Sequence, residues 1–153
     1  MEAPRPILLV EDNPKDVELT LSALELANVT NEVVVKRDGR EALDYLLRRG
    51  DQAARGGLDP CVVLLDLKLP LIDGLEVLAA VKSDKALRRI PVVMLTASKE
   101  ESDVVASYQL GTNAYVVKPL GFQEFLDAVR DLGTFWGVLN MTPRVFEGAP
   151  TAA

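Results

Sequence analysis

The 153-residue sequence contains no histidine and only one cysteine, and both absences limit the chemistry open to it. Without histidine, the chain cannot build a Ser–His or Cys–His catalytic pair, a histidine-ligated zinc site or a phosphohistidine of its own. With Cys61 as the only thiol, it cannot form an internal disulfide. Cys61 lies in an apolar run, which predicts a buried structural thiol. Any chemistry within the chain must therefore use carboxylates, hydroxyls and lysines.

Long apolar runs and an excess of positive charge are lacking as well. No run approaches the roughly 18 residues of a membrane span, and the N-terminus has no secretory signal pattern, so we expect a cytoplasmic protein without a membrane partner. The net charge of −6 argues against nucleic acid as a ligand, because binding to phosphate backbones needs an excess of Lys and Arg. An apolar content of 48% is typical of a folded protein, and the length suits a single domain.

Five short apolar runs alternate along the chain with segments that have helical spacing. The runs cover residues 7–10, 33–35, 62–65, 92–95 and 115–117. This alternation predicts an α/β fold: a doubly wound, five-stranded parallel sheet with five helices in a three-layer sandwich. We expect residues 1–140 to form one domain, residues 48–60 to form a surface loop and residues 141–153 to be a flexible tail.

Polar side chains follow four of the five predicted strands directly. They are Glu11, Asp12, Asp66, Thr96 and Lys118. Each has an ordinary explanation when taken alone, as a turn residue, a hydroxyl at a strand end or a solvated charge. Because parallel strands present their carboxyl ends at one edge of the sheet, we expect the five side chains to converge there. Three acids, a hydroxyl and an ammonium in one crevice indicate a functional site.

The acids of this predicted site require a cation. Two carboxylates about 4 Å apart repel each other by roughly 4 kcal/mol at an effective dielectric constant near 20. Oxygen ligands with room for water and phosphate suit Mg²⁺. We therefore predict a magnesium-dependent phosphoryl site, in which Asp66 is the nucleophile. Lys118 and Mg²⁺ would neutralise the transferred oxygens, and Thr96 would donate a hydrogen bond to one of them.

The same residues resemble the signature of the receiver domain of two-component response regulators. The matching segments are Glu11-Asp12, LLDLKLP around Asp66 followed by Asp73-Gly74, Leu95-Thr96-Ala97, Tyr115 and Lys118-Pro119. The resemblance extends over about residues 5–138 and implies the flavodoxin-like strand order 2-1-3-4-5.

The resemblance also implies a role for each site residue. Asp66 would accept the phosphoryl group, and Asp12 and Asp66 would bind Mg²⁺. Glu11 would act on the ion through water, and the backbone carbonyl of Lys68 would be a further ligand.

Two further features implied by the resemblance concern the switch and the backbone. Lys118 would contact the phosphoryl group and would be joined to Pro119 by a cis peptide bond. Thr96 would move toward the phosphoryl oxygen, and Tyr115 would rotate inward to form the switch.

The function implied is that of a response regulator that receives a phosphoryl group from a separate sensor histidine kinase. Its only chemistry would be Mg²⁺-dependent self-phosphorylation and autodephosphorylation, so we do not expect an enzyme. The long loop at residues 48–60 and the Phe135-Trp136 pair resemble single-domain regulators of bacterial phytochromes. The signal would leave through a protein surface, and we expect a homodimer through the fourth predicted helix (about residues 99–110), the fifth predicted strand (115–117) and the fifth predicted helix (from about residue 121). Tyr115, Phe135, Trp136, Val138 and Leu139 would form an apolar patch there.

Three alternatives remain open. An aspartyl-phosphate phosphohydrolase normally has a second Asp two residues after its nucleophile, where this chain has Lys68. A flavodoxin-like carrier of FMN would need a phosphate cradle after the first strand, where Glu11 and Asp12 would repel the phosphate. The third is a receiver-like module that binds its partners without being phosphorylated.

Overall fold

A five-stranded parallel sheet in the order β2-β1-β3-β4-β5 forms the centre of the computed structural model, which describes residues 4–141. The strands are β1 (Ile7–Val10), β2 (Val33–Lys36), β3 (Val62–Leu65), β4 (Val92–Thr96) and β5 (Ala114–Val117). Each neighbouring pair is parallel and in register, for example Ile7 with Val33 and with Val62. The predicted sheet and strand order are confirmed.

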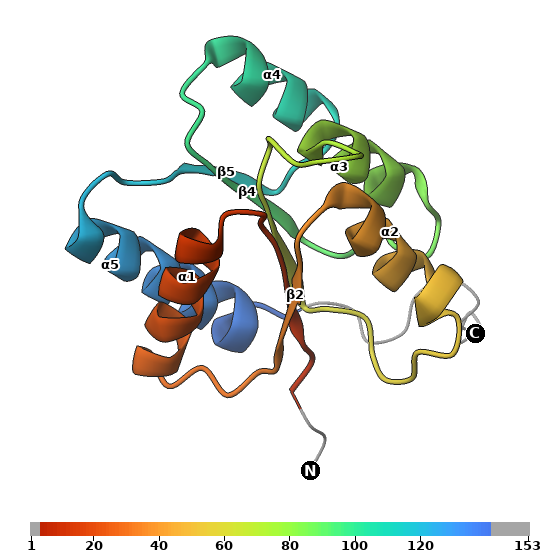
Figure 1. Ribbon diagram of the computed structural model, residues 1–153, viewed down its shortest axis with the longest axis horizontal. Coiled ribbons are helices and arrows are strands. Elements are labelled where there is room, and N and C mark those ends of the chain that lie inside the picture. The colour runs from red at the N-terminus through yellow and green to blue at the C-terminus, as the bar shows by residue number, and fades with distance from the viewer. Residues whose placement is uncertain (1–3, 142–153) are drawn as a thin grey trace.

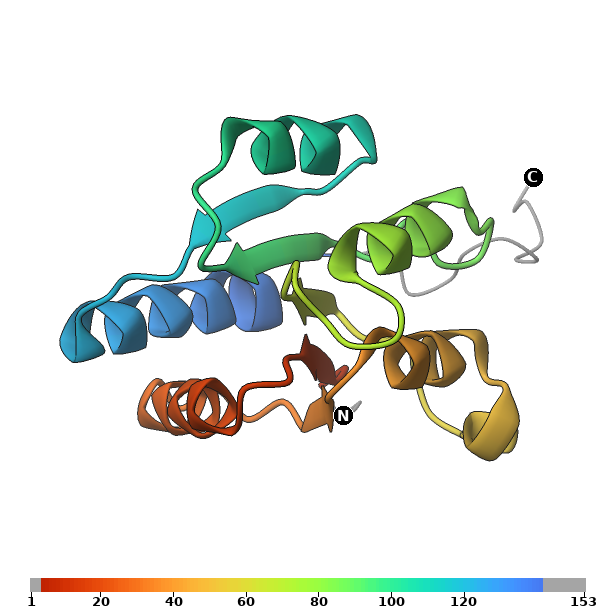
Figure 2. The ribbon, with the colours of Figure 1, turned by 45° about the horizontal axis from the view of Figure 1, so that its top comes forward.

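Five α-helices cover the two faces of the sheet and complete the predicted three-layer sandwich (Figures 1 and 2). They are α1 (Pro14–Leu26), α2 (Gly39–Leu47), α3 (Gly74–Ser83), α4 (Glu101–Gln109) and α5 (Phe122–Leu132). Helices α1 and α5 pack together on one face, whereas α3 contacts both α2 and α4 on the other. No helix between residues 4 and 141 combines the length and apolarity needed to cross a bilayer.

The core follows from the alternation of side chains along each strand. In β1, Leu8 and Val10 join the cluster beneath α2 and α3, while Ile7 and Leu9 join the cluster on the α1 and α5 face. All four side chains are at most 2% exposed. Burial on both faces explains why the central strands read as continuous aliphatic runs.

Capping residues set the starts of α1 and α3. The side chain of Asn13 accepts hydrogen bonds from the amides of Lys15 and Asp16, and Pro14 occupies the first turn. Asp73 caps α3 in the same way by accepting from the amide of Glu76. These caps lie directly after β1 and in the loop after β3, so they also fix the loops at the carboxyl edge of the sheet.

The loop at residues 48–60 lies mostly at the surface and is held by polar contacts. It contains a short 3₁₀ turn (Gly50–Gln52), and the buried carboxylate of Asp59 forms ion pairs with Arg48 and Arg55. The guanidinium of Arg55 also stacks on Tyr45, 3.9 Å from the ring centroid. These ion pairs and the ring contact anchor the loop to α2.

The chain continues beyond α5 in a π-helical segment, Gly133–Leu139. Trp136 packs against the core cluster on the α1 and α5 face, whereas Tyr115 packs against the cluster on the opposite face of the sheet. The expected patch is therefore divided, because Tyr115 and Trp136 pack on opposite faces of the sheet. Phe135, Val138 and Leu139 remain exposed. Of the expected tail, residues 142–153 lie outside the described part of the chain.

Cys61 provides a test of the predicted core. Its side chain is 7% exposed, and burial raises the pKa of its thiol, so little thiolate is available to react. We expect a disulfide reagent to modify native protein much more slowly than protein unfolded in guanidinium, as followed by release of the coloured thiolate. Equal rates in the two states would contradict the packing described for Cys61.

Candidate functional site

The sheet places four of the five predicted site residues by its own hydrogen bonds. The amide of Glu11 donates to the carbonyl of Lys36 at 3.0 Å, and the amide of Asp66 donates to Val10 at 3.0 Å. The amide of Lys118 donates to the carbonyl of Thr96 at 2.7 Å. Because these bonds continue the hydrogen bonding of the sheet at the strand ends, the backbone of each site residue is held by a neighbouring strand.

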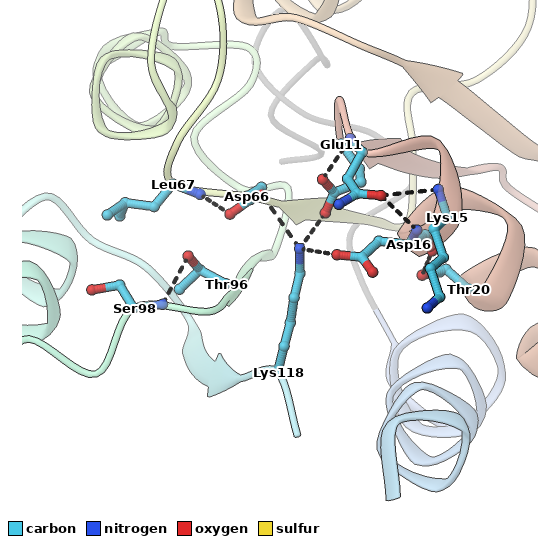
Figure 3. Close-up of polar contacts among 10 residues, drawn as sticks. Glu11, Lys15, Asp16, Thr20, Asp66, Leu67, Thr96, Ser98 and Lys118 are labelled. Carbon is cyan, nitrogen blue, oxygen red and sulfur yellow. Dashed lines mark hydrogen bonds and ion pairs between the residues drawn. The ribbon is translucent and has the colours of Figure 1, made fainter. Parts of the chain in front are cut away.

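Lys118 lies at the centre of the site and contacts three carboxylates (Figure 3). Its Nζ atom is 2.5 Å from Glu11 Oε1, 2.8 Å from Asp16 Oδ2 and 3.3 Å from Asp66 Oδ2. Burial alone would lower the pKa of Lys118, but its hydrogen bonds to Asp16 and Glu11 outweigh that effect and raise the pKa above its usual value. Lys118 is therefore a permanent positive charge at this edge of the sheet.

The acidic cluster has the composition of a divalent cation site. One carboxylate oxygen from each of Glu11, Asp12 and Asp66 lies within 4.8 Å of the other two. Glu11 and Asp66 are buried, and Asp12 is exposed, which leaves one side of the cluster open to water. Oxygen donors with an open side fit a hard cation that keeps part of its hydration. The single ammonium of Lys118 cannot neutralise Glu11, Asp12 and Asp66 together.

The pKa of the Glu11 carboxyl group is shifted by its surroundings. Burial raises its pKa to about 7, with a contribution from the nearby charge of Asp66, although the hydrogen bond from Lys118 acts in the opposite direction. Its Oε2 atom also accepts a hydrogen bond from the amide of Asn13 at 3.0 Å. A cation at the cluster would compete with a proton for this group.

Asp66 and Thr96 face the same open cleft, which has a volume of about 1000 Å³. Asp66 Oδ1 accepts a hydrogen bond from the amide of Leu67 at 2.7 Å, so the carboxylate has a fixed orientation. The Thr96 side chain is almost fully buried, yet the residue borders the cleft. The cleft thus contains a nucleophilic carboxylate, a cation-binding cluster, an ammonium and a hydroxyl, which together suit phosphoryl chemistry.

Tyr115 is connected to Thr96 through Ser98. The Tyr115 hydroxyl donates to the carbonyl of Ser98 at 3.0 Å, and the amide of Ser98 lies 3.4 Å from Thr96 Oγ1. Ser98 Oγ in turn donates to Asp103 Oδ2 at 2.5 Å, which fixes the loop between β4 and α4. Burial raises the pKa of Tyr115, so its hydroxyl keeps the proton that it donates.

Comparison with known proteins identifies this arrangement. The family model described as the response regulator receiver domain matches residues 7–130. The chain belongs to the response regulator receiver family. Its members are signalling proteins that are controlled by phosphorylation, and the fold and site described above agree with this assignment.

Several relatives match the receiver along nearly their whole length. Rcp1 of Synechocystis sp. is 40% identical over 133 residues, covering 87% of this chain and 89% of Rcp1. A crystal structure of Rcp1 with bound Mn²⁺ has a TM-score of 0.86 and 38% identity, covering 92% of this chain and 99% of that one.

Two further solved structures are similar to the receiver. The phosphorylated cyanobacterial phytochrome response regulator RcpA is 42% identical with a TM-score of 0.86, covering 92% of this chain and 99% of that one. The bacteriophytochrome response regulator AtBRR is 63% identical with a TM-score of 0.74, covering 92% of this chain and all of that one.

One predicted feature of the receiver is wrong. The bond between Lys118 and Pro119 is trans, as are all peptide bonds between residues 4 and 141. The trans form of an X–Pro bond is favoured by about 0.5–1 kcal/mol. Lys118 reaches its three carboxylates with the trans bond in place, so these contacts do not require the cis form.

Two contacts within the site were not predicted from the sequence. Asp16 contacts Lys118 from the first turn of α1, and the only signal for it was an acid four residues after Asp12 in a helix that starts at the site. Gly74 lies against the acceptor loop, where a Cβ atom would be 2.1 Å from the carbonyl oxygen of Asp66. Its amide donates to the carbonyl of Leu67 at 2.8 Å.

The close approach of Gly74 to Asp66 predicts a strong effect of a small substitution. We expect Gly74→Ala to lower the free energy of unfolding by at least about 2 kcal/mol, because the added methyl group would overlap backbone atoms. Gly56→Ala is the matched control, since a Cβ atom there would contact nothing within 4 Å, and it should change stability by less than about 0.5 kcal/mol. Denaturant titrations of both variants test this, and equal stabilities would show that the loop packs differently.

The raised pKa of Glu11 predicts a pH dependence of stability. The folded state holds this proton more tightly than the unfolded chain, so the contribution is complete below about pH 4.5 and is lost as the pH rises to about 7. The loss has an upper limit of about 3 kcal/mol. In buffer with EDTA, wild type should therefore lose stability relative to Glu11→Gln between pH 5 and pH 8. Parallel pH profiles for the two proteins would contradict this assignment.

Proposed function

We propose that this receiver accepts a phosphoryl group on Asp66 from the phosphohistidine of a sensor kinase. The observation that carries the proposal is the convergence of Asp66, the acidic cluster and Lys118 at one edge of the sheet. A histidine-free chain needs a donor in another protein, which agrees with a relay between two chains.

The proposed transfer is a displacement at phosphorus. A carboxylate oxygen of Asp66 attacks the phosphorus atom and forms a P–O bond, while the P–N bond to the donor imidazole breaks. The electron pair of that bond remains on the imidazole nitrogen. Lys118 stabilises the negative charge on the transferred oxygens, and the Thr96 hydroxyl donates to one of them. Later attack of water on the phosphorus would release phosphate and restore Asp66, so the receiver acts on itself and is not an enzyme with external turnover.

We infer that the cation is Mg²⁺, held directly by Asp12 and Asp66. Glu11 would bind it through water, and the backbone carbonyl of Lys68 would provide a further ligand. The clustering of the three carboxylates supports their part in this set, and the Mn²⁺-bound form of Rcp1 supports a divalent cation. When bound, Mg²⁺ would supply charge neutralisation for the phosphoryl oxygens.

Thr96 and Tyr115 are the proposed switch. A new phosphoryl group would attract the Thr96 hydroxyl, and the movement would reach Tyr115 through the loop that contains Ser98. The hydrogen bonds of Ser98 to both residues support this route. The phosphoryl charge would thereby change the surface formed by β5 and the neighbouring helices.

The proposed partner is a sensor histidine kinase of the phytochrome type. The similarity to RcpA and AtBRR supports this choice, since both are regulators of phytochromes. We further propose that residues 1–140 act as one receiver domain in the cytoplasm, where such a kinase would present its phosphohistidine. The signal would then leave through protein contacts.

Phosphorylation has a direct test. With Mg²⁺ and a small phosphodonor such as acetyl phosphate, we expect an adduct of one phosphoryl group that is stable in acid and labile in base, as measured by intact mass. Asp66→Asn should abolish the adduct, and chelation of Mg²⁺ should prevent it. Absence of the adduct in folded wild type would favour the receiver-like binding module, and its persistence in Asp66→Asn would remove Asp66 as the acceptor.

We also propose a homodimer that uses α4, β5, α5 and the π-helical segment after it. Val138 and Leu139 are 60% and 68% exposed, which leaves apolar surface at the end of this segment. Trp136 is unsuitable as a test position because its ring contributes to the core.

Sedimentation of Leu139→Ser would test the dimer. If the proposal holds, wild type sediments as a dimer and the variant dissociates at protein concentrations where wild type does not. Leu26→Ser is the control, because Leu26 is similarly exposed but belongs to α1, which is not one of the four segments of the proposed interface. A wild type that is monomeric at all concentrations would exclude the dimer.

A further inference from the structure

Asp16 is a charged contact of the site that the proposed function does not use. It lies in the first turn of α1, and its Oδ2 atom is 2.8 Å from Lys118 Nζ (Figure 3). This distance is shorter than the 3.3 Å between the same nitrogen and Asp66 Oδ2. In the described structure, Lys118 is therefore held more closely by Asp16 than by Asp66.

The hydrogen-bonding capacity of Lys118 is fully used. An ammonium group has three N–H donors, and Lys118 has three carboxylate partners. If Lys118 is to donate to a phosphoryl oxygen on Asp66, one existing partner must give up its bond. Lys118 must therefore exchange a carboxylate for the phosphoryl oxygen, because its ammonium group has no fourth N–H donor.

Asp16 is the partner best able to release Lys118. Its side chain is 24% exposed, compared with 4% for Glu11 and 10% for Asp66. Water can therefore replace Lys118 as the hydrogen-bond donor to Asp16 at a lower free-energy cost than at the other two carboxylates. Glu11 is held in place by the amide of Asn13, and Asp66 is the group that would carry the phosphoryl.

The backbone of Asp16 is fixed even though its carboxylate can turn. Its amide donates to the Asn13 side chain at 3.3 Å, and its carbonyl accepts from Thr20 Oγ1 at 2.7 Å. Turning of the side chain toward solvent therefore leaves the first turn of α1 in place.

We propose that Asp16 is a positioning residue that holds Lys118 in the unphosphorylated receiver and competes with the phosphoryl group for it. This inference rests on the proposed function. Lys118 exchanges its bond to Asp16 for one to a phosphoryl oxygen, and the strength of the Asp16 contact sets how readily the phosphorylated state forms. The negative charge of Asp16 also repels the negatively charged phosphoryl group. The ion pair with Lys118 and this repulsion therefore both disfavour the phosphorylated state.

The test uses beryllofluoride, a stable mimic of a phosphoryl group on a carboxylate, at saturating Mg²⁺. Occupancy is followed by ¹⁹F NMR. Asp16→Asn should lower the half-saturating concentration about fivefold, the change that corresponds to loss of one partly exposed ion pair. Asp16→Glu keeps the charge and should return the half-saturating concentration toward that of wild type. A merely structural role for Asp16 would not produce this rescue.

Two controls separate the contact from general charge effects. Glu18→Gln removes one negative charge from an exposed position of the same helix. Within residues 4–141, Glu18 is not among the ion-pair partners of Lys118. This variant should change the half-saturating concentration of beryllofluoride less than about twofold. In a Lys118→Ala background, most of the effect of Asp16→Asn should disappear, because the two residues act as a pair. Thermal unfolding checks that each variant is folded.

The outcomes distinguish this inference from the proposed function. Binding to wild type that is abolished in Asp66→Asn supports the acceptor assignment, whatever the Asp16 variants do. Unchanged or weaker binding in Asp16→Asn overturns the competition. An equal effect of Asp16→Asn with and without Lys118 also overturns it. A folded wild type that does not bind beryllofluoride at all overturns both proposals.

Discussion

The contact of one ammonium group with three carboxylates is the interaction on which the site depends. Lys118 joins the end of β5 to acids that follow β1 and β3 and to the first turn of α1. Removing Lys118 would leave the buried carboxylates of Glu11 and Asp66 without their positive partner, which is strongly unfavourable. When all are ionised, the four acids Glu11, Asp12, Asp16 and Asp66 still exceed this single positive charge. The site is thus held together by Lys118 and remains attractive to a further cation.

This charge arrangement is possible because the fold supplies rigid positions for it. A parallel sheet places the carboxyl ends of its strands at one edge, so residues more than one hundred positions apart become neighbours there. Glu11, Asp66 and Lys118 are each anchored by a backbone hydrogen bond to the adjacent strand. The proposed changes on phosphorylation then involve side chains and the hydrogen bonds of Ser98. A signal can therefore begin as a local change of hydrogen bonds without rearrangement of the sheet.

Much of this organisation could be predicted from the sequence. The aliphatic runs indicated strands buried on both faces, and the polar residues at their ends indicated the site. Asp16 escaped prediction because an acid in the first turn of a helix is common, and only the length and direction of the Lys118 side chain bring them together. Gly74 belongs to the segment that matched the receiver signature, but its close approach to Asp66 depends on how α3 packs. The trans bond at Pro119 and the burial of Trp136 also depend on tertiary contacts, which no local pattern determines.

The central claim is that this edge of the sheet directs a phosphoryl group to one of four neighbouring acids. The most direct measurement is to treat the phosphorylated protein with borohydride, which reduces an acyl phosphate to an alcohol, and to locate the product by peptide mass spectrometry. The account predicts homoserine at position 66, dependent on Mg²⁺, with Glu11, Asp12 and Asp16 unmodified. Reduction at one of those three acids, or none at position 66 in a sample shown to carry phosphate, would contradict it.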